Sequence, residues 1–280
     1  MFSVVILTKN EEVNLPDCLA CVRAHSDDVH LLDSGSTDDT VAIAERHGIS
    51  VHVHPFTSFG QQRNWAIDNI NHKHDWVFHL DADERFTRDL AEEIRQLLRE
   101  DGGYAGFRVP SKLMLGSSWL KRSGEYPAYQ VRLFHRDRLR FTDSGHGQKE
   151  ITDGRLGTLQ QPYLHFAFRK GIDEWMEKHV RYAFQEALHY RKEKRSLGLD
   201  LQNLFSRDPI ERRRATKRLS FRLPARGTLR LIHLLLIKRG ILDGQAGIAY
   251  ARMKAIYESM IAVQIAALDA GIASEEGPRS

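Results

Sequence analysis

The chain has 280 residues, of which 41% are hydrophobic and 28% are charged, a composition typical of a globular protein that can bury a substantial core. Its apolar runs are shorter than the roughly 18 residues of a membrane-spanning helix, and the opening run at 2–8 is too short for a signal peptide. These observations argue against an integral membrane or secreted protein, and we expect the site to work in the cytoplasm.

Apolar strands and amphipathic helices alternate through the first hundred residues. In chain order, strands are predicted at 3–8, 29–32, 49–53, 76–80 and 106–110, and helices at 13–24, 38–47, 61–70 and 90–99. This order predicts an α/β fold with a mostly parallel, doubly wound sheet. Helices with apolar stripes are predicted at 172–189 and 246–268. We therefore expect an α/β domain at 1–170, a helical appendage at 171–273 and a disordered tail at 274–280.

Three polar clusters follow predicted strands, at 8–11, 33–40 and 81–83. Because the carboxyl ends of parallel strands meet at one edge of a sheet, we expect these clusters to converge there. In the second cluster, Gly35 permits a tight turn, and Asp33 is left free to accept hydrogen bonds from a ribose or base. In the third, Asp81-Ala82-Asp83 offers the carboxylate oxygens that Mg²⁺ or Mn²⁺ shares with a diphosphate. No glycine-rich dinucleotide loop and no P-loop is present.

With these residues, the chain resembles the inverting family-2 glycosyltransferases of GT-A fold. The resemblance rests on segments 3–11, 33–38 and 60–66 and on Asp81-Ala82-Asp83. Segments 129–134 and 238–244 and the region of His165 resemble the subgroup that adds sugars to lipopolysaccharide cores or similar envelope glycans.

The resemblance implies a site for a nucleoside-diphosphate sugar, with a UDP-sugar favoured. The residues expected to contact this donor are Thr8, Asn10, Glu11, Asp33, Ser36, Arg63, Asp81 and Arg132. Asp83, together with Asp81, would bind the Mg²⁺ or Mn²⁺ that bridges the phosphates. Arg169 is a further candidate for phosphate contact.

Inversion requires a general base that takes the proton of the acceptor hydroxyl. Relatives of the subgroup tend to have a His-Glu pair after the Arg-Leu-Phe element, whereas this chain reads Ser-Gly-His-Gly-Gln-Lys-Glu at 144–150. Glu150 is our first candidate and His146 the second, and Glu125 or Asp143 is an alternative. His165 has three interpretations: a structural histidine, an acceptor contact or a ligand on the metal side.

Positive charge is concentrated in one segment of the chain. Residues 207–239 contain 11 Lys or Arg against 2 Asp or Glu, whereas the rest of the chain contains 30 against 35. Because bulky apolar residues are interleaved with these basic ones, the segment favours an anionic membrane surface, with a basic solvated face on the core as the alternative. Nucleic acid is disfavoured because no nucleic-acid motif is present. The apolar stripe of the last helix could also pair two subunits into a homodimer.

The expected function is transfer of a sugar to a glycan or glycolipid acceptor, by a protein peripheral to the inner face of the cytoplasmic membrane. Two alternatives remain open at this point. One is a GT-A scaffold that binds nucleotide without catalysis, and the other is a sugar nucleotidyltransferase.

Overall fold

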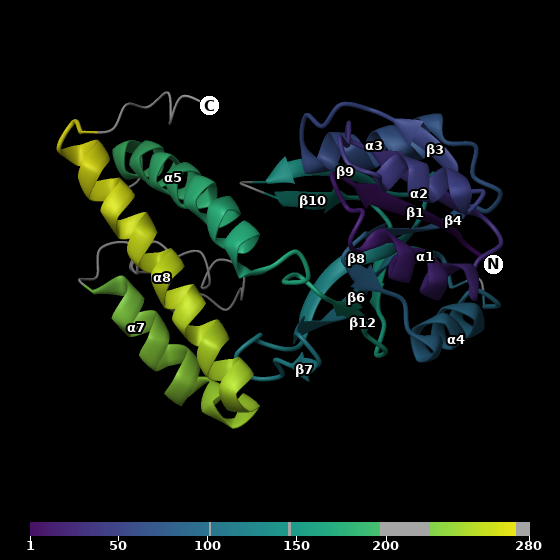
Figure 1. Ribbon diagram of the computed structural model, residues 1–280. Coiled ribbons are helices and arrows are strands. Elements are labelled where there is room, and N and C mark those ends of the chain that lie inside the picture. The colour runs from purple at the N-terminus through teal and green to yellow at the C-terminus, as the bar shows by residue number, and fades with distance from the viewer. Residues whose placement is uncertain (101, 145–146, 197–224, 273–280) are drawn as a thin grey trace. The chain divides into compact units, whose positions relative to one another are not determined.

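The computed structural model describes residues 1–100, 102–144, 147–196 and 225–272. The chain divides into two compact units (Figure 1). Unit 1 comprises Met1–Trp119 and Glu125–Lys170, and unit 2 comprises Leu120–Gly124 and Gly171–Ser280. His146, residues 207–224 of the basic segment and the tail at 274–280 lie outside the described residues.

The first half of the unit 1 sheet is parallel. Strand β1 (Ser3–Thr8) pairs with β2 (Val29–Asp33) on one side and with β4 (Trp76–Asp81) on the other, and β2 pairs with β3 (Ser50–Val53). The connecting helices are α1 (Leu15–Arg23), α2 (Thr40–Arg46) and α3 (Phe59–Asn69), and α4 (Arg88–Leu97) follows β4. This half confirms the predicted α/β alternation.

The second half of the sheet is mixed. Strand β8 (Ala128–His135) is antiparallel to β4 and to β6 (Tyr104–Leu115), and β12 (Tyr163–His165) is parallel to β6. The shorter strands are β5 (Glu84–Arg85), β7 (Ser118–Trp119) and β11 (Arg155–Thr158). A separate hairpin joins β9 (Arg140–Ser144) to β10 (Gly147–Ile151). The sheet as a whole is therefore mixed, whereas β1 to β4 are parallel to one another. The antiparallel pairing arises because β6 and β8 are joined without a crossover helix.

The core lies on both faces of the sheet. On β1, Val4 and Ile6 belong to a cluster with Leu15 of α1, whereas Val5 belongs to a cluster with Ala66 of α3. Successive side chains of a strand point to opposite faces, so the apolar run of β1 buries both of its sides. The fold class expected from the sequence is confirmed, and it places the ends of β1, β2 and β4 at one edge.

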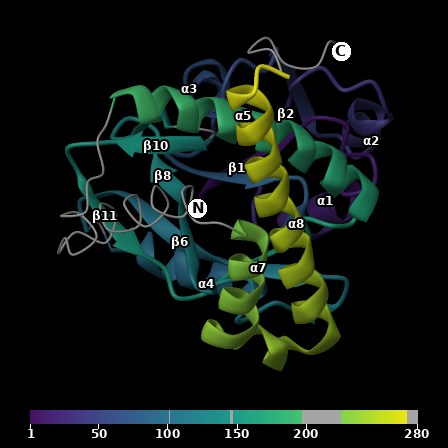
Figure 2. The ribbon, with the colours of Figure 1, turned by 90° about the vertical axis from the view of Figure 1, so that its left-hand side faces the viewer.

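Unit 2 is helical, with α8 (Gly244–Asp269) packed against α5 (Ile172–Ser196) and α7 (Arg226–Ile232) (Figure 2). A π-helical turn, η2 (His233–Ile237), and a 3₁₀ turn, η3 (Gly240–Asp243), connect α7 to α8. A Cβ on Gly247 would lie 2.2 Å from the Gly240 carbonyl oxygen, so glycine permits this close approach. Among the described residues, no helix is both long and apolar enough to cross a membrane.

Residues 120–124 belong to unit 2, although the sequence placed them within the α/β domain. The backbone N–H groups of Arg122 and Ser123 donate to Asp243 Oδ2 at 2.9 and 2.8 Å, and the Ser123 hydroxyl donates to the same oxygen at 2.7 Å. Three donors on one carboxylate oxygen hold this short segment against the start of α8.

Candidate active site

The loops that follow β1 and β2 bind each other through their polar side chains. Strand pairing places Thr8 opposite Asp33 and Leu7 opposite Asp81, so the three polar clusters share one sheet edge. Asn10 adopts a positive φ of 54°, and its Oδ1 accepts from Thr37 N at 2.8 Å. The Asn10 N–H in turn donates to Ser36 Oγ at 2.7 Å. Asn10 and Ser36 therefore fix the first loop against the second.

Asp33 is not left free, contrary to the expectation from the sequence. Its side chain is buried, its Oδ2 accepts from the N–H groups of Gly35 and Ser36 at 2.8 and 2.7 Å, and its Oδ1 accepts from the hydroxyls of Thr8 and Ser36 at 3.0 and 2.5 Å. The turn folds back onto its own carboxylate, as Asp side chains commonly do. A nucleoside contact by Asp33 would require displacing one of these donors.

Glu11 lies beside the same edge and is held by a cation. Lys170 Nζ lies 2.6 Å from Glu11 Oε1, and Asn14 Nδ2 donates to Oε2 at 2.8 Å. Burial raises the pKa of Glu11, and the bonds from Lys170 and Asn14 oppose that rise. Both carboxylate oxygens of Glu11 are thus engaged within unit 1.

Two buried arginines hold Asp81. Arg132 Nη2 donates to Asp81 Oδ2 at 2.8 Å, and Arg63 Nη2 lies 3.4 Å from Oδ1. Burial alone would raise the pKa of Asp81, but the two guanidinium groups hold it well below its ordinary value. The Asp81 side chain keeps 40% of its surface exposed, so a fixed carboxylate remains accessible to a ligand.

Glu84 is a site residue that the sequence analysis missed. It is 1% exposed, it accepts from Arg132 Nη2 at 2.5 Å, and its Oε2 accepts from Asp81 N at 3.0 Å. Burial raises the pKa of Glu84 to about 7. The only signal for it was its position one residue after the acidic triplet, which does not reveal burial.

Arg132 has a different environment from the one expected. Only 2% of its side chain is exposed, and its Nη2 is shared between Asp81 and Glu84. The guanidinium thus fixes the orientation of Asp81. Its Nε and Nη1 are buried and have no hydrogen-bond partner among the described residues, so the predicted contact with phosphate stays a prediction. Arg169 is likewise paired, with Asp17, a residue near the start of α1.

Arg63 faces the site from α3. Its Nε donates to Gln148 Oε1 at 2.7 Å, and its Nη1 is buried without a hydrogen-bond partner among the described residues. Burial lowers the pKa of Arg63 to about 10, so the guanidinium stays charged at neutral pH. A buried cationic donor with unused hydrogen-bonding capacity is suited to an anionic ligand.

Asp83 and His165 form the pair that could hold a divalent cation. His165 Nε2 lies 3.2 Å from Asp83 Oδ2. Burial alone would lower the pKa of His165, but the Asp83 carboxylate raises it to about 9, so His165 is protonated and pairs with Asp83. A divalent cation would have to displace that proton before the imidazole nitrogen could coordinate it, whereas the Asp83 carboxylate oxygens suit Mg²⁺ or Mn²⁺ directly.

A cleft of about 370 Å³ within unit 1 brings three of the predicted residues together. It contains Arg63 of α3, Asp81 at the end of β4 and Glu150 of β10. The other lining residues are Phe59, Arg108, Tyr129, Gln130, Val131, Phe141 and Gln148. Glu150 Oε1 lies 3.7 Å from Arg108 Nη2. Four charged side chains from separate segments, Arg108 included, thus line one hollow.

Two further candidates for the general base, Asp143 and Glu125, lie among the described residues, whereas His146 does not. Asp143 Oδ1 accepts from Gly60 N at 3.0 Å and so binds the first turn of α3. Glu125 has a positive φ of 58°. Neither residue lines the cleft that contains Glu150.

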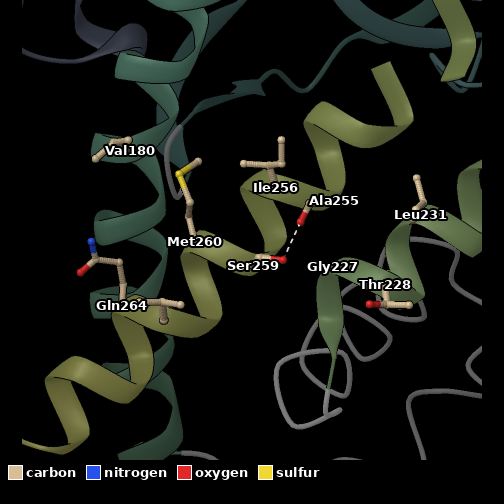
Figure 3. A pocket seen from close by; sticks show the side chains of 10 residues that line it. Val180, Gly227, Thr228, Leu231, Ala255, Ile256, Ser259, Met260 and Gln264 are labelled. Carbon is tan, nitrogen blue, oxygen red and sulfur yellow. Dashed lines mark hydrogen bonds between the residues drawn. The ribbon is translucent and has the colours of Figure 1, made fainter. Parts of the chain in front are cut away.

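Unit 2 has a hollow of its own, of about 430 Å³, between α5, α7 and α8 (Figure 3). Its lining includes Val180 of α5 and Ile256 and Met260 of α8, and Ser259 Oγ donates to the Ala255 carbonyl at 2.9 Å. None of its lining residues is charged, so it does not suit a diphosphate.

A family model described as Glycosyl transferase family 2 matches residues 3–149. The lipopolysaccharide core biosynthesis glycosyltransferase LpsC of Rhizobium meliloti is 27% identical over 192 residues, which cover 66% of this chain and 70% of LpsC. An uncharacterized glycosyltransferase of Rickettsia conorii is 38% identical over 95 residues, which cover 34% of this chain and 33% of that relative. The match thus spans about a third of the length of the Rickettsia relative.

Two solved structures match this chain at low identity, both with TM-scores below 0.5. Glucosyl-3-phosphoglycerate synthase from Mycobacterium tuberculosis, in complex with Mn²⁺ and uridine-diphosphate-glucose, is 21% identical, with a TM-score of 0.38 over 49% of this chain and 56% of the other. Residues 1–349 of S. aureus TarS are 15% identical, with a TM-score of 0.42 over 96% of this chain and 91% of the other.

Proposed function

The chain belongs to glycosyl transferase family 2, and from that premise we propose that it transfers a sugar, with inversion, from a nucleoside-diphosphate sugar to a glycan hydroxyl. The observation that carries this proposal is the unit 1 cleft, where Arg63, Asp81 and Glu150 meet. The likeness to LpsC supports a lipopolysaccharide-core or related envelope glycan as the acceptor. We favour UDP as the nucleotide of the donor.

The cleft supplies fixed charges where the leaving group would develop charge. As the glycosidic bond breaks, negative charge grows on the departing diphosphate, and a preorganised cation stabilises that charge. Arg63 is such a cation, because burial and its bond to Gln148 restrict its orientation. Mg²⁺ or Mn²⁺ held by Asp83, with Asp81 as the second carboxylate, would neutralise the phosphates further.

Glu150 is the proposed general base. It lies in the same cleft as Asp81, on a strand outside the main sheet, so it can face the acceptor side of the donor. Its role is to take the proton of the attacking hydroxyl, which makes that oxygen a better nucleophile. His146 remains the second candidate and lies outside the described residues.

We further propose that unit 2 docks on an anionic membrane, at the inner face of the cytoplasmic membrane. Around η2 and η3, Leu236, Ile237, Ile241 and Leu242 are 52–70% exposed. Lys238 and Arg239 lie between these apolar residues in the sequence. Exposed apolar side chains next to basic ones insert at the boundary of headgroups and acyl chains while the cations meet anionic lipid.

The proposal is tested by hydrolysis and transfer with a panel of nucleoside-diphosphate sugars in Mn²⁺ or Mg²⁺. Wild type is compared with Asp83→Asn and with Asp89→Asn, an exposed carboxylate on α4 that serves as the matched control. We expect nucleoside diphosphate to be released by wild type and Asp89→Asn, and at least about a hundredfold less by Asp83→Asn.

One outcome would contradict the metal site, and two would contradict sugar transfer itself. Equal turnover by Asp83→Asn would remove Asp83 from the mechanism. Binding of nucleotide without turnover of any donor, with envelope glycan acceptors present, would favour a non-catalytic scaffold. Release of pyrophosphate from a nucleoside triphosphate would indicate a sugar nucleotidyltransferase.

A further inference from the structure

Three potential metal ligands gather at the edge of unit 1 opposite the candidate active site. Asp28 precedes β2, His30 is the second residue of β2, and His72 lies between α3 and β4. One ligand atom from each lies within 4.8 Å of the other two. Because β2 ends at Asp33 on the active-site edge, its first residues lie at the other edge of the sheet.

The surroundings of His72 leave one ring nitrogen ready to bind an ion. The side chain is 5% exposed, and its Nε2 lies 3.0 Å from the Ala66 carbonyl oxygen. A carbonyl only accepts, so Nε2 holds the proton and Nδ1 presents a lone pair. That Nδ1 is buried and has no hydrogen-bond partner among the described residues. An unpartnered buried nitrogen is costly, and a bound cation would satisfy it.

His30 and Asp28 complete the arrangement from the other side. His30 Nε2 lies 3.0 Å from Asp28 Oδ1, and the rings of His30 and His72 meet edge to face with centroids 5.7 Å apart. His30 Nδ1 lies 3.4 Å from His52 Nε2, and Asp28 Oδ2 accepts from Lys73 N at 2.8 Å. Secondary bonds of this kind orient metal ligands.

We propose that Asp28, His30 and His72 bind a divalent transition metal ion, with Zn²⁺ the best match. Two imidazoles and one carboxylate form a donor set typical of Zn²⁺ and unlike the all-oxygen sites of Mg²⁺. Three protein ligands leave a fourth position for water. The ion would tie the connection between α3 and β4 to the start of β2 and so stabilise unit 1. This site is independent of the proposed glycosyl transfer.

The test measures Zn²⁺ binding to the metal-free full chain by isothermal titration, with Zn²⁺ alone as the probe. In His72→Gln, the amide can replace the Nε2 donor to Ala66 but supplies no Nδ1. In His30→Asn, the amide can replace Nδ1 toward His52 but supplies no Nε2. His47→Asn removes an exposed histidine elsewhere, and Asp83→Asn removes the candidate active-site ligand.

We expect wild type, His47→Asn and Asp83→Asn to bind one Zn²⁺ with equal affinity at the new site. His72→Gln and His30→Asn should bind it at least about a hundredfold more weakly, because each lacks a direct ligand. The proposal is overturned if wild type takes up no Zn²⁺, or if both histidine variants keep the wild-type affinity.

A second measurement needs no variant and so does not depend on variant folding. Zn²⁺ should slow amide hydrogen exchange in wild type at residues 28–30 and 70–74, where the ion would hold the loop. Slowing confined to residues around 81–83 would place the ion in the candidate active site and overturn the proposal.

Discussion

Replacement of Arg132 by methionine should destabilise unit 1 strongly at pH 8. The guanidinium is 2% exposed and pairs with Glu84 at 2.5 Å and with Asp81 at 2.8 Å. Removing one partner of a buried ion pair typically costs about 3–5 kcal/mol, because an uncompensated charge stays behind. A domain of ordinary stability has about 5–15 kcal/mol in total, so the expected loss is a large part of it.

The pH dependence of this loss is specific to Glu84. Burial raises its folded pKa to about 7, above the ordinary value of 4.5, so the folded state binds more protons than the unfolded state between these values. Stability contributed by Glu84 is therefore present at low pH and is lost as pH rises toward 7. Without Arg132 the folded pKa of Glu84 should rise further, so the free energy of unfolding should continue to fall above pH 7.

Glu84→Gln should rescue the Arg132→Met variant, because it removes the buried charge that methionine leaves unpaired. We expect the double variant at pH 8 to be less destabilised than the sum of the single variants by about 1.5 kcal/mol or more. At pH 6 the coupling should shrink, since Glu84 is then largely protonated.

The assay is urea unfolding at pH 6, 7 and 8, followed by tryptophan fluorescence in a Trp175→Phe background. The remaining tryptophans, Trp65, Trp76 and Trp119, all lie in unit 1, so the signal reports that unit. Additive effects at pH 8, or an Arg132→Met penalty that does not change between pH 6 and 8, would refute this account of the buried ion pair.

Three further predictions address the base, a buried histidine and the membrane. Glu150→Gln should lower kcat by about 10² to 10⁴ while the Kd for nucleotide is unchanged. If kcat and the affinity for nucleotide fell by the same factor, Glu150 would not be the general base. Burial holds the pKa of His79 well below its ordinary value. The neutral, buried His79 therefore contributes to the stability of the folded state above pH 6.5, and this contribution is lost as the pH falls. His79→Leu should therefore reduce acid destabilisation by up to about 1.4 kcal/mol per pH unit below 6.5, and identical pH profiles in urea melts would contradict this. Ile237→Asp should weaken cosedimentation with phosphatidylserine vesicles, whereas Val53→Asp in unit 1 should not. Ile237 is 70% exposed and its control Val53 is 62% exposed, and an equal effect of the two variants would exclude η2 as the contact.

Local sequence patterns determined the first half of the fold. The strand predicted at 3–8 is β1, and the alternation of strands and helices through residue 99 corresponds to the parallel half of the sheet. These features are readable because strand and helix periodicity depends on near neighbours in the chain. The ends of three parallel strands also placed the polar clusters at one edge, which follows from topology alone.

Long-range pairing decided the rest. Arg132 reads as an ordinary strand residue until β8 pairs antiparallel to β4, which places its guanidinium beneath Asp81 and against Glu84. Asp33 reads as a free carboxylate until its turn folds back on it. Asp28 and His72 are far apart in sequence and meet only because β2 and the segment before β4 flank β1. Burial and charge pairing depend on which segments become neighbours in space, and no local pattern contains that information.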